Sequence, residues 1–409
     1  MRRALTILVL AALAASTLLL ASCGGKFPLP TQVPAPPPGD NTYKMQAAWW
    51  GMDDIRAILL THGTGTQLFL LFNHGGTGTA QRGEIRSYPR LWNPKSDNPT
   101  QPPPQIAITF QTLFNPTALC AGGDGTGNAA NRIFVLDQGD TMQARVNPLT
   151  GVYGDTTGLS TVLRLTWRMN QVSHLELFWR VREFSLVGGD TLSSFCDTTL
   201  AIPNGIAADD QGRVYLCGIA IVGAPDPTDP TKITRAAQWR VYRYVRTDVA
   251  GSDLFMPGCR WRRDATWVAK EGSGTGFVQD PRAMFWSGTN GGGVFECDYL
   301  PNQNRVQKLD PANPNSGFFS LNGTETDSKL AFDAPSDVSV DESGYVYVAD
   351  SGNQRVLRYD GTGAFVQTVN TDPAVTLQNP ATIAVDDTLV YVGDPDQRKV
   401  FRYFLKRRP

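Results

Sequence analysis

Four aspartates occupy the same place in four short repeated segments, and arginines follow three of them. The aspartates are Asp137, Asp298, Asp350 and Asp394, and the arginines are Arg305, Arg355 and Arg398. Carboxylates that recur around an axis could hold a hard cation through oxygen ligands. The same residues could instead form an aspartate–arginine pair that supports each repeat. We favour this structural role, because residues that recur in every repeat serve the repeat, whereas catalytic residues would break the symmetry.

Histidines offer a second candidate chemistry. The chain has three, His62, His74 and His174, which is the minimum for a three-histidine zinc site. His62 and His74 end two successive predicted strands, so they should lie at opposite ends of a hairpin, roughly 20 Å apart at about 3.4 Å per residue. We therefore expect no such site. The motifs G-x-S-x-G, H-E-x-x-H and C-x-x-C do not occur in the sequence.

The elements that carry these residues are short strands in a repeat. The clearest copy, Pro335 to Phe365, reads PSDVSVDESGYVYVADSGNQRVLRYDGTGAF, with alternating apolar residues and acidic or glycine-rich turns. A second copy begins at Pro380, and looser copies begin at Pro116, Pro203 and Pro281. A proline-led strand, a V-Y-V-A-D strand and an N-x-R-V strand resemble the NHL-repeat family of β-propellers. The resemblance implies an all-β propeller of four-stranded blades.

The repeat spacing sets the number of blades. The five proline-led copies, together with a blade predicted from Asp53 to Gln111, give six. Seven blades is the alternative, because the interval from Pro116 to Pro203 could hold two blades, or one blade with an inserted hairpin at Val162–Trp167 or His174–Trp179. After Pro380 only three strands fit before the chain ends. We expect the stretch from Met45 to Gly51 to supply the missing outer strand and close the ring.

The predicted insertions favour one face of the ring as the binding face. In an up-and-down blade, the loop before strand 1 and the loop joining strands 2 and 3 open on the same face. The repeated aspartates share that face with the long excursion from Gly218 to Trp239. Insertions on one face of a repeat array usually mark its binding face. The predicted ligand face comprises Asp137, Asp298, Asp350, Asp394 and Trp239.

The N-terminus carries the features of an exported lipoprotein. A basic start and an apolar run from Ala4 to Ala21 form a signal peptide. Leu20-Ala21-Ser22-Cys23 resembles the bacterial lipobox, in which the cysteine receives acyl chains such as palmitate and becomes the mature N-terminus. Gly24 follows the cysteine in place of an aspartate, which in a bacterium with two membranes favours delivery to the outer membrane. We predict a signal peptide over 1–22, a lipidated cysteine and proline-rich linker over 23–43, and an NHL-like propeller over 44–409.

Five cysteines remain after Cys23, and the sequence does not determine any pairing between them. Cys217 and Cys297 stand where Ala349 stands in the clearest repeat. That position needs a small buried side chain, so we predict packing roles for both.

These features point to binding more than to catalysis. The formal net charge of −1 offers no electrostatic basis for binding nucleic acid. We predict an envelope lipoprotein, attached to the membrane by its N-terminal lipid, whose propeller binds an envelope protein or a small ligand and needs no cofactor. The alternative is a metal-dependent hydrolase or lyase, similar to gluconolactonases or amidating lyases, with a divalent cation held by carboxylates such as Asp298 or Asp350.

Overall fold

The computed structural model describes residues 40–409 except for 62–66, 75–82, 90–97, 107–112, 114, 125–130, 141–170, 173–174, 177, 187–188, 190, 198, 226–232, 248–259, 290, 300–303, 317–318, 322–330, 372–374 and 408–409. The predicted signal peptide, Cys23 and the linker as far as residue 39 lie outside the described residues. In the described part of the chain, no helix is long and apolar enough to cross a membrane.

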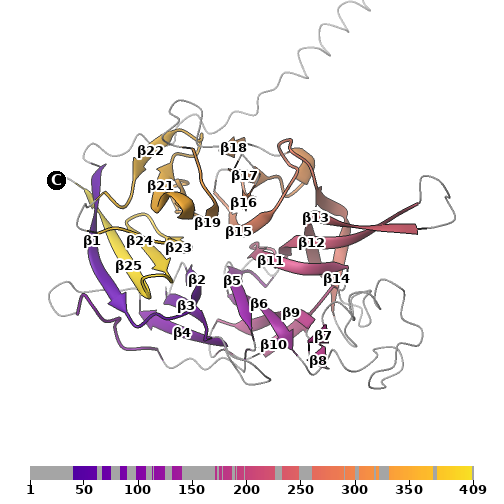
Figure 1. Cartoon of the computed structure of the whole chain (residues 1–409), viewed down its shortest axis with the longest axis horizontal. Coiled ribbons are helices and arrows are strands. Elements are labelled where there is room, and N and C mark those ends of the chain that lie inside the picture. The colour runs from indigo at the N-terminus through magenta and orange to yellow at the C-terminus, as the bar shows by residue number, and fades with distance from the viewer. Residues whose placement is uncertain are drawn as a thin grey trace, which may run out of the picture.

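Six antiparallel sheets stand around a central axis, one sheet per blade (Figure 1). The chain passes around the ring in order, and the first strand of each blade lies next to the axis. This is the all-β propeller predicted from the repeats, with six blades rather than the alternative seven.

The strands of the first three blades, from the axis outward, are β2 (Ile55–Leu60), β3 (Gln67–Asn73) and β4 (Gly83–Pro89) in blade 1; β5 (Pro116–Gly122), β6 (Arg132–Asp140), β9 (Phe178–Ser185) and β10 (Thr191–Phe195) in blade 2; and β11 (Leu200–Ala208), β12 (Val214–Pro225), β13 (Ile233–Arg246) and β14 (Trp261–Lys270) in blade 3. The remaining blades contain β15 (Pro281–Ser287), β16 (Gly293–Asp298), β17 (Arg305–Leu309) and β18 (Phe319–Leu321) in blade 4; β19 (Pro335–Val340), β20 (Val346–Asp350), β21 (Arg355–Tyr359) and β22 (Phe365–Thr368) in blade 5; and β23 (Thr382–Val385), β24 (Leu389–Asp394), β25 (Lys399–Arg407) and β1 (Asp40–Trp50) in blade 6. Two 3₁₀ turns, η1 (Pro314–Ser316) and η3 (Ser351–Asn353), lie in loops.

The interval from Pro116 to Pro203 is a single blade with an inserted hairpin. Two short strands, β7 (Gln171–Val172) and β8 (Leu175–Glu176), pair with each other between β6 and β9. Of the two predicted hairpins, His174–Trp179 instead overlaps β8 and the start of β9, and Val162–Trp167 lies outside the described residues. The described residues of the interval form one four-stranded blade, in agreement with a ring of six.

The ring closes between the two ends of the described chain. Strand β1 pairs antiparallel with β25 from Asp40 to Trp50, which confirms that an N-terminal strand completes the last blade. The strand begins at Asp40, before the boundary at residue 44 that the sequence predicts. The Tyr43 and Tyr347 hydroxyls hydrogen-bond at 2.8 Å and join this closing strand to blade 5.

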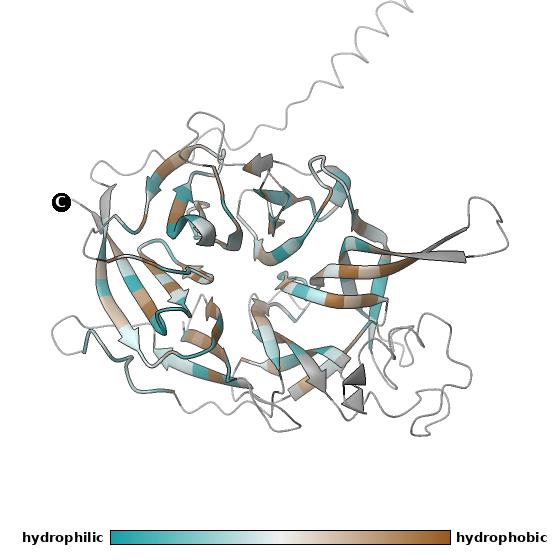
Figure 2. Ribbon diagram, viewed as in Figure 1, coloured by the Kyte–Doolittle hydropathy of each residue, from teal (hydrophilic) through white to brown (hydrophobic). Residues whose placement is uncertain are grey.

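Six apolar clusters among the described residues fill the spaces between neighbouring blades. Successive side chains of a strand point to opposite faces of its sheet, so each blade contributes to the clusters on both of its sides. Figure 2 shows the resulting mixture of hydrophobic and hydrophilic residues along the strands. Cys217 and Cys297 are fully buried in two of these clusters, as predicted.

Candidate functional site

The four repeated aspartates are fully buried, and each fixes the chain just before strand 1 of its own blade. A backbone N–H from that segment donates to each carboxylate at 2.7 to 2.8 Å; the pairs are Asn115 with Asp137, Gln279 with Asp298, Asp333 with Asp350, and Gln378 with Asp394. The aspartate that ends strand 2 therefore anchors the loop that enters strand 1. All four lie outside the lining of the axial pocket described below.

The arginine partners follow the predicted pattern in two blades. Arg305 lies 2.8 Å from Asp298, and Arg355 lies 2.8 Å from Asp350.

Blades 2 and 6 depart from the pattern. Asp137 pairs at 3.2 Å with Arg182, which comes from the third strand. Asp394 accepts a hydrogen bond from the Gln397 side chain at 2.9 Å. Arg398 has a left-handed backbone in the turn before β25, and its exposed side chain pairs with Asp53 at 3.2 Å instead.

Burial dominates the acidity of these carboxyl groups. Removal from water raises the pKa of Asp298 and of Asp350, while hydrogen bonds and the neighbouring arginines oppose the shift. Asp298 and Asp350 are the residues that the enzyme alternative would use to hold a cation, and each is already committed to an arginine. In the described residues, no group of three or more His, Cys, Asp or Glu side chains lies close enough together to hold a metal ion.

The histidines are only partly described. His62 and His174 lie outside the described residues. His74 is exposed and lies 3.2 Å from Glu84.

Trp239 belongs to a hairpin that projects away from the ring. Strands β12 and β13 continue past the body of blade 3, with Ile219 opposite Trp239, and Figure 1 shows them extending outward from the axis. The Trp239 ring is half-buried against the cluster between blades 3 and 4, and its backbone N–H donates to Glu271 at 2.8 Å. Gly218 lies opposite Pro203, so the excursion leaves from the end of the ring where the prolines lie, as the sequence predicts.

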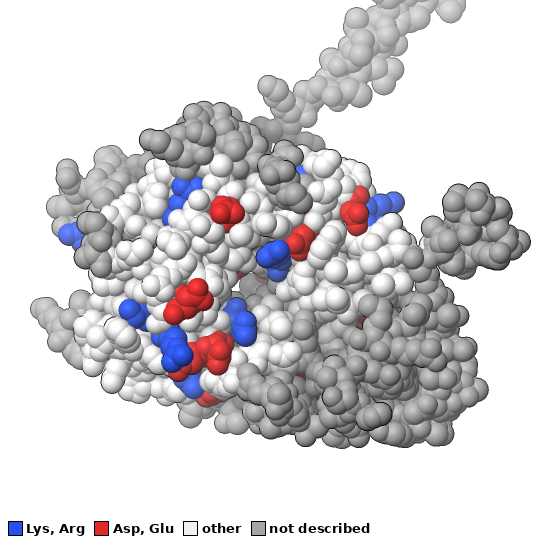
Figure 3. All heavy atoms as spheres, viewed as in Figure 1, with Lys and Arg blue, Asp and Glu red and all other residues white. Residues whose placement is uncertain are grey.

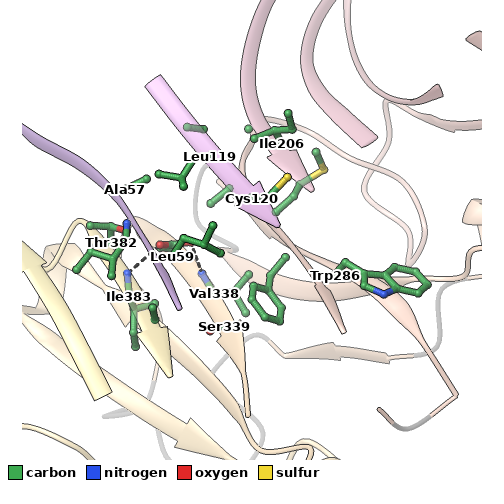
Figure 4. A pocket seen from close by; sticks show the side chains of 18 of the residues that line it. Ala57, Leu59, Leu119, Cys120, Ile206, Trp286, Val338, Ser339, Thr382 and Ile383 are labelled. Carbon is green, nitrogen blue, oxygen red and sulfur yellow. Dashed lines mark hydrogen bonds between the residues drawn. The ribbon is translucent and has the colours of Figure 1, made fainter. Parts of the chain in front are cut away.

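A pocket of about 410 Å³ lies on the axis, lined by the six innermost strands. Pockets that hold small ligands usually have volumes of about 300–1,000 Å³. Apolar side chains such as Leu59, Leu119, Ile206, Val338 and Ile383 form much of its wall (Figure 4). The pocket is therefore large enough to hold a small ligand.

One residue from each blade forms a ring at the end of the pocket nearest the prolines, which we call the proline end. Each directly follows the proline of its blade, or Ile55 in blade 1, and we call the set the mouth ring: Arg56, Thr117, Asn204, Arg282, Ser336 and Ala381. Two of its members join neighbouring blades, since Asn204 Nδ2 donates to the Pro281 carbonyl at 3.2 Å and Ser336 Oγ to the Pro380 carbonyl at 2.7 Å. No single residue type recurs throughout this ring, so a search for recurring residues does not find it. The sequence feature that could have revealed the ring is the residue directly after each leading proline, whose type changes from blade to blade.

The next ring inward is made of small residues, with one carboxylate among them: Ala57, Ala118, Gly205, Ala283, Asp337 and Thr382. Asp337 is half-buried and accepts hydrogen bonds from the backbone N–H groups of Val338 and Ile383, both at 2.9 Å and both drawn in Figure 4. Burial raises the pKa of Asp337 to about 6, although these hydrogen bonds oppose the shift. Asp337 is thus the carboxylate that the wall of the pocket presents near the proline end.

The two ends of the pocket differ in charge. Arg56 and Arg282 line the proline end, whereas Asp210, Asp341 and Glu342 line the opposite end. Arg282 forms an ion pair with Asp280 at 2.9 Å. Asp341 is buried, and its carboxylate accepts a hydrogen bond of 2.9 Å from the Tyr347 hydroxyl. In the described part of the chain, Arg56 and Asp210 form no ion pair and no side-chain hydrogen bond. Figure 3 shows both signs of charge around the hollow centre of the face in view.

One repeat matches a known family directly. Residues 332–359 match the family model of the NHL repeat. The match covers the first three strands of blade 5, which is the repeat that the sequence singled out. Taken with the ring of six blades, it supports a propeller built from NHL-type repeats.

Solved structures with a similar fold are distant in sequence. A protein of unknown function from Bacteroides thetaiotaomicron is 10% identical with a TM-score of 0.47, covering 89% of this chain and 76% of that one. The WD40 propeller of Doa1 is 10% identical with a TM-score of 0.42, covering 89% and 97% of the two chains. A luciferin-regenerating enzyme is 11% identical with a TM-score of 0.42, covering 89% and 95%. No curated protein matches the chain significantly in sequence.

Proposed function

We propose that this protein is a binding module of the bacterial envelope, tethered by a lipid on Cys23, which holds a small ligand in the axial pocket of its propeller. The observation that carries the proposal is the pocket itself, about 410 Å³ in volume and lined by side chains that differ from blade to blade. The six positions of the mouth ring hold five different residue types, and within the described part of the chain only Asn204 and Ser336 use their side chains to join neighbouring blades.

The wall of the pocket has the composition of a ligand site. Most of it is apolar, and a few polar groups converge on the proline end, which is the usual arrangement where orientation of a ligand matters. The Asp337 carboxylate accepts hydrogen bonds from the backbone N–H groups of Val338 and Ile383 and from the Thr382 side chain. A carboxylate has about four lone-pair sites, so Asp337 can still accept one hydrogen bond from a ligand.

The tether places this pocket outside the cell membrane. Proline-rich chain favours an extended conformation at about 3.1 Å per residue, so the linker after Cys23 would hold the propeller up to roughly 50 Å from the lipid. Strand β1, the outer strand of the last blade, follows this linker in the sequence, so the stalk would join the ring at its closing strand.

Blocking the pocket tests the assignment. Ala57 lines the proline end of the pocket, so Ala57→Phe should fill it, whereas Ala236→Phe changes an exposed residue of the β12–β13 hairpin and serves as the control. The mature protein is purified from its membranes, and the small molecules released on denaturation are identified by mass spectrometry.

We expect wild type and Ala236→Phe to carry the same small molecule and Ala57→Phe to lose it while melting as a folded propeller. If folded Ala57→Phe retains that molecule, or if wild type carries none, the axial pocket is not the binding site.

A further inference from the structure

We propose that the axial pocket binds a linear zwitterion in an extended conformation, with its anionic group at Arg56 and its cationic group at Asp210. A short peptide of small residues with free ends has this chemistry. The proposal deepens the proposed function and rests on the same pocket.

The two ends of the pocket carry side chains of opposite charge. Arg56 on blade 1 and Asp210 on blade 3 both line the pocket and, among the described residues, have neither an ion pair nor a side-chain hydrogen bond. Charged side chains without partners beside a pocket are available to a ligand, and charge-assisted hydrogen bonds are the stronger kind. An Arg at one end and an Asp at the other select for a ligand whose own two ends carry opposite charges.

The length of the pocket gives the length of the ligand. Arg56 is equivalent to Ser336 in blade 5, and Asp210 is equivalent to Glu342, as the strand pairings show. Strand β19 covers four residue steps from Ser336 to Val340, roughly 13 Å at about 3.3 Å per residue, and the turn that holds Glu342 extends the span to roughly 13–17 Å. A pentapeptide with a reach of about 17 Å would span that distance.

The width of the pocket excludes a bulky ligand. A volume of about 410 Å³ spread over that length leaves a cross-section of roughly 24–32 Å². This accommodates one extended chain with small side chains. The small residues of the ring that contains Ala57 and Gly205 keep the proline end open to such a chain.

The inner strands favour a peptide over other linear zwitterions. Each of β2, β5, β11, β15, β19 and β23 is the edge strand of its sheet and faces the axis. An edge strand presents N–H and C=O groups that are not used within its sheet, and a peptide backbone complements those that are not already bonded to a neighbouring blade, as the N–H groups of Ile58 and Ile383 are. Asp337 adds an acceptor for a peptide N–H near the Arg56 end.

Calorimetry with alanine peptides tests the proposal on the full protein. The probes are penta-alanine with free ends, its C-terminal amide, its N-acetyl derivative and dialanine. We expect free penta-alanine to bind about tenfold more tightly than either blocked form, because each blocked form loses one charge-assisted contact. Dialanine, about 7 Å long, cannot reach both ends and should bind at least tenfold more weakly than penta-alanine.

Two charge-removing variants assign each end of the peptide. Arg56→Gln should abolish the preference for free penta-alanine over the amide and leave the preference over the acetyl form. Asp210→Asn should do the reverse. Arg398→Gln, which removes an exposed arginine outside the pocket, should change neither preference.

The inference is overturned if free penta-alanine fails to bind wild type at millimolar concentration. It is also overturned if free penta-alanine, its C-terminal amide and its N-acetyl derivative bind wild type with the same affinity. Failure of the proposed function looks different. If penta-alanine fails but Ala57→Phe still displaces the native small molecule, the pocket is a binding site for another chemistry. If penta-alanine binds wild type and folded Ala57→Phe equally, the pocket assignment itself is wrong.

Discussion

Replacing Arg305 by Met should destabilise the propeller far more than an ordinary surface change. Arg305 donates to the Asp298 carboxylate at 2.8 Å and to the Ser273 carbonyl at 2.7 Å, and both partners of the ion pair are almost completely buried. Methionine fills a similar volume but leaves Asp298 without a cation. Removing one partner of a buried ion pair typically costs about 3–5 kcal/mol, because the remaining charge is stranded away from water.

This loss converts into a measurable melting shift. With an unfolding entropy of about 2.1 cal/mol/K per residue, roughly 370 residues give about 0.8 kcal/mol/K, so a loss of 3–5 kcal/mol lowers Tm by about 4–6 °C. Burial already raises the pKa of Asp298, and the variant should raise it further. A carboxyl group with a raised folded pKa contributes stability at low pH and loses it as the pH rises. The deficit of the variant should therefore be smaller at pH 5 than at pH 8.

Differential scanning calorimetry at both pH values measures these effects, with Arg282→Met as the matched control. Arg282 pairs with Asp280 at 2.9 Å, but its side chain is 47% exposed, and exposed pairs contribute about 0–1 kcal/mol. If Arg305→Met lowers Tm no more than Arg282→Met does, the aspartates that end the second strands do not stabilise the blades through their arginine partners, and another role would have to be assigned to them.

Four further predictions follow from particular residues. Cys23→Ser should move the protein from the membrane to the soluble fraction; continued fractionation with membranes would refute the lipid anchor. Gly205→Ala should lower the free energy of unfolding by about 1–3 kcal/mol, because the added Cβ would lie 2.8 Å from the Arg282 carbonyl oxygen; an unchanged midpoint of urea unfolding would contradict this close approach of blades 3 and 4. The pKa of Asp337 is raised from 3.8 to about 6, so the free energy of unfolding of wild type relative to Asp337→Asn should fall as the pH rises from about 4 to 6; a difference that does not change with pH would contradict the raised pKa of this half-buried carboxylate. Chelation should leave Tm unchanged, whereas a stoichiometric divalent ion whose removal lowers Tm would favour the hydrolase or lyase alternative.

The fold was predictable because each blade repeats a strong local pattern. Alternating apolar residues, acidic turns and a leading proline recur at Pro335 and Pro380, and strands β19 and β23 begin at or just after these prolines. Closure by the N-terminal strand was predictable from the three strands that follow Pro380, because an unpaired sheet edge needs a partner.

The departures occur where local sequence does not determine a partner. Arg398 stands one residue before the position of Arg355, which Lys399 occupies in blade 6, so its side chain leaves from the left-handed turn residue and pairs with Asp53 of the next blade. The hairpin inserted in blade 2 was one of several alternatives, since two apolar stretches fitted the spacing equally well. Both outcomes depend on packing between segments far apart in the chain, which local patterns do not report.

The candidate site escaped prediction for a reason that follows from the symmetry of the ring. Recurrent residues such as Asp350 anchor their own blade. The Asp350 carboxylate accepts a hydrogen bond from a backbone N–H and pairs with Arg355, so these contacts serve the blade and not a ligand. A ligand on the axis meets one residue from every blade at each level, so it can be recognised only where the blades differ. Ser336 and Arg56 occupy equivalent positions, yet the serine joins two blades while the arginine has no partner among the described residues. In a propeller of this kind, the informative positions for function are those that keep their place in the repeat but not their residue type.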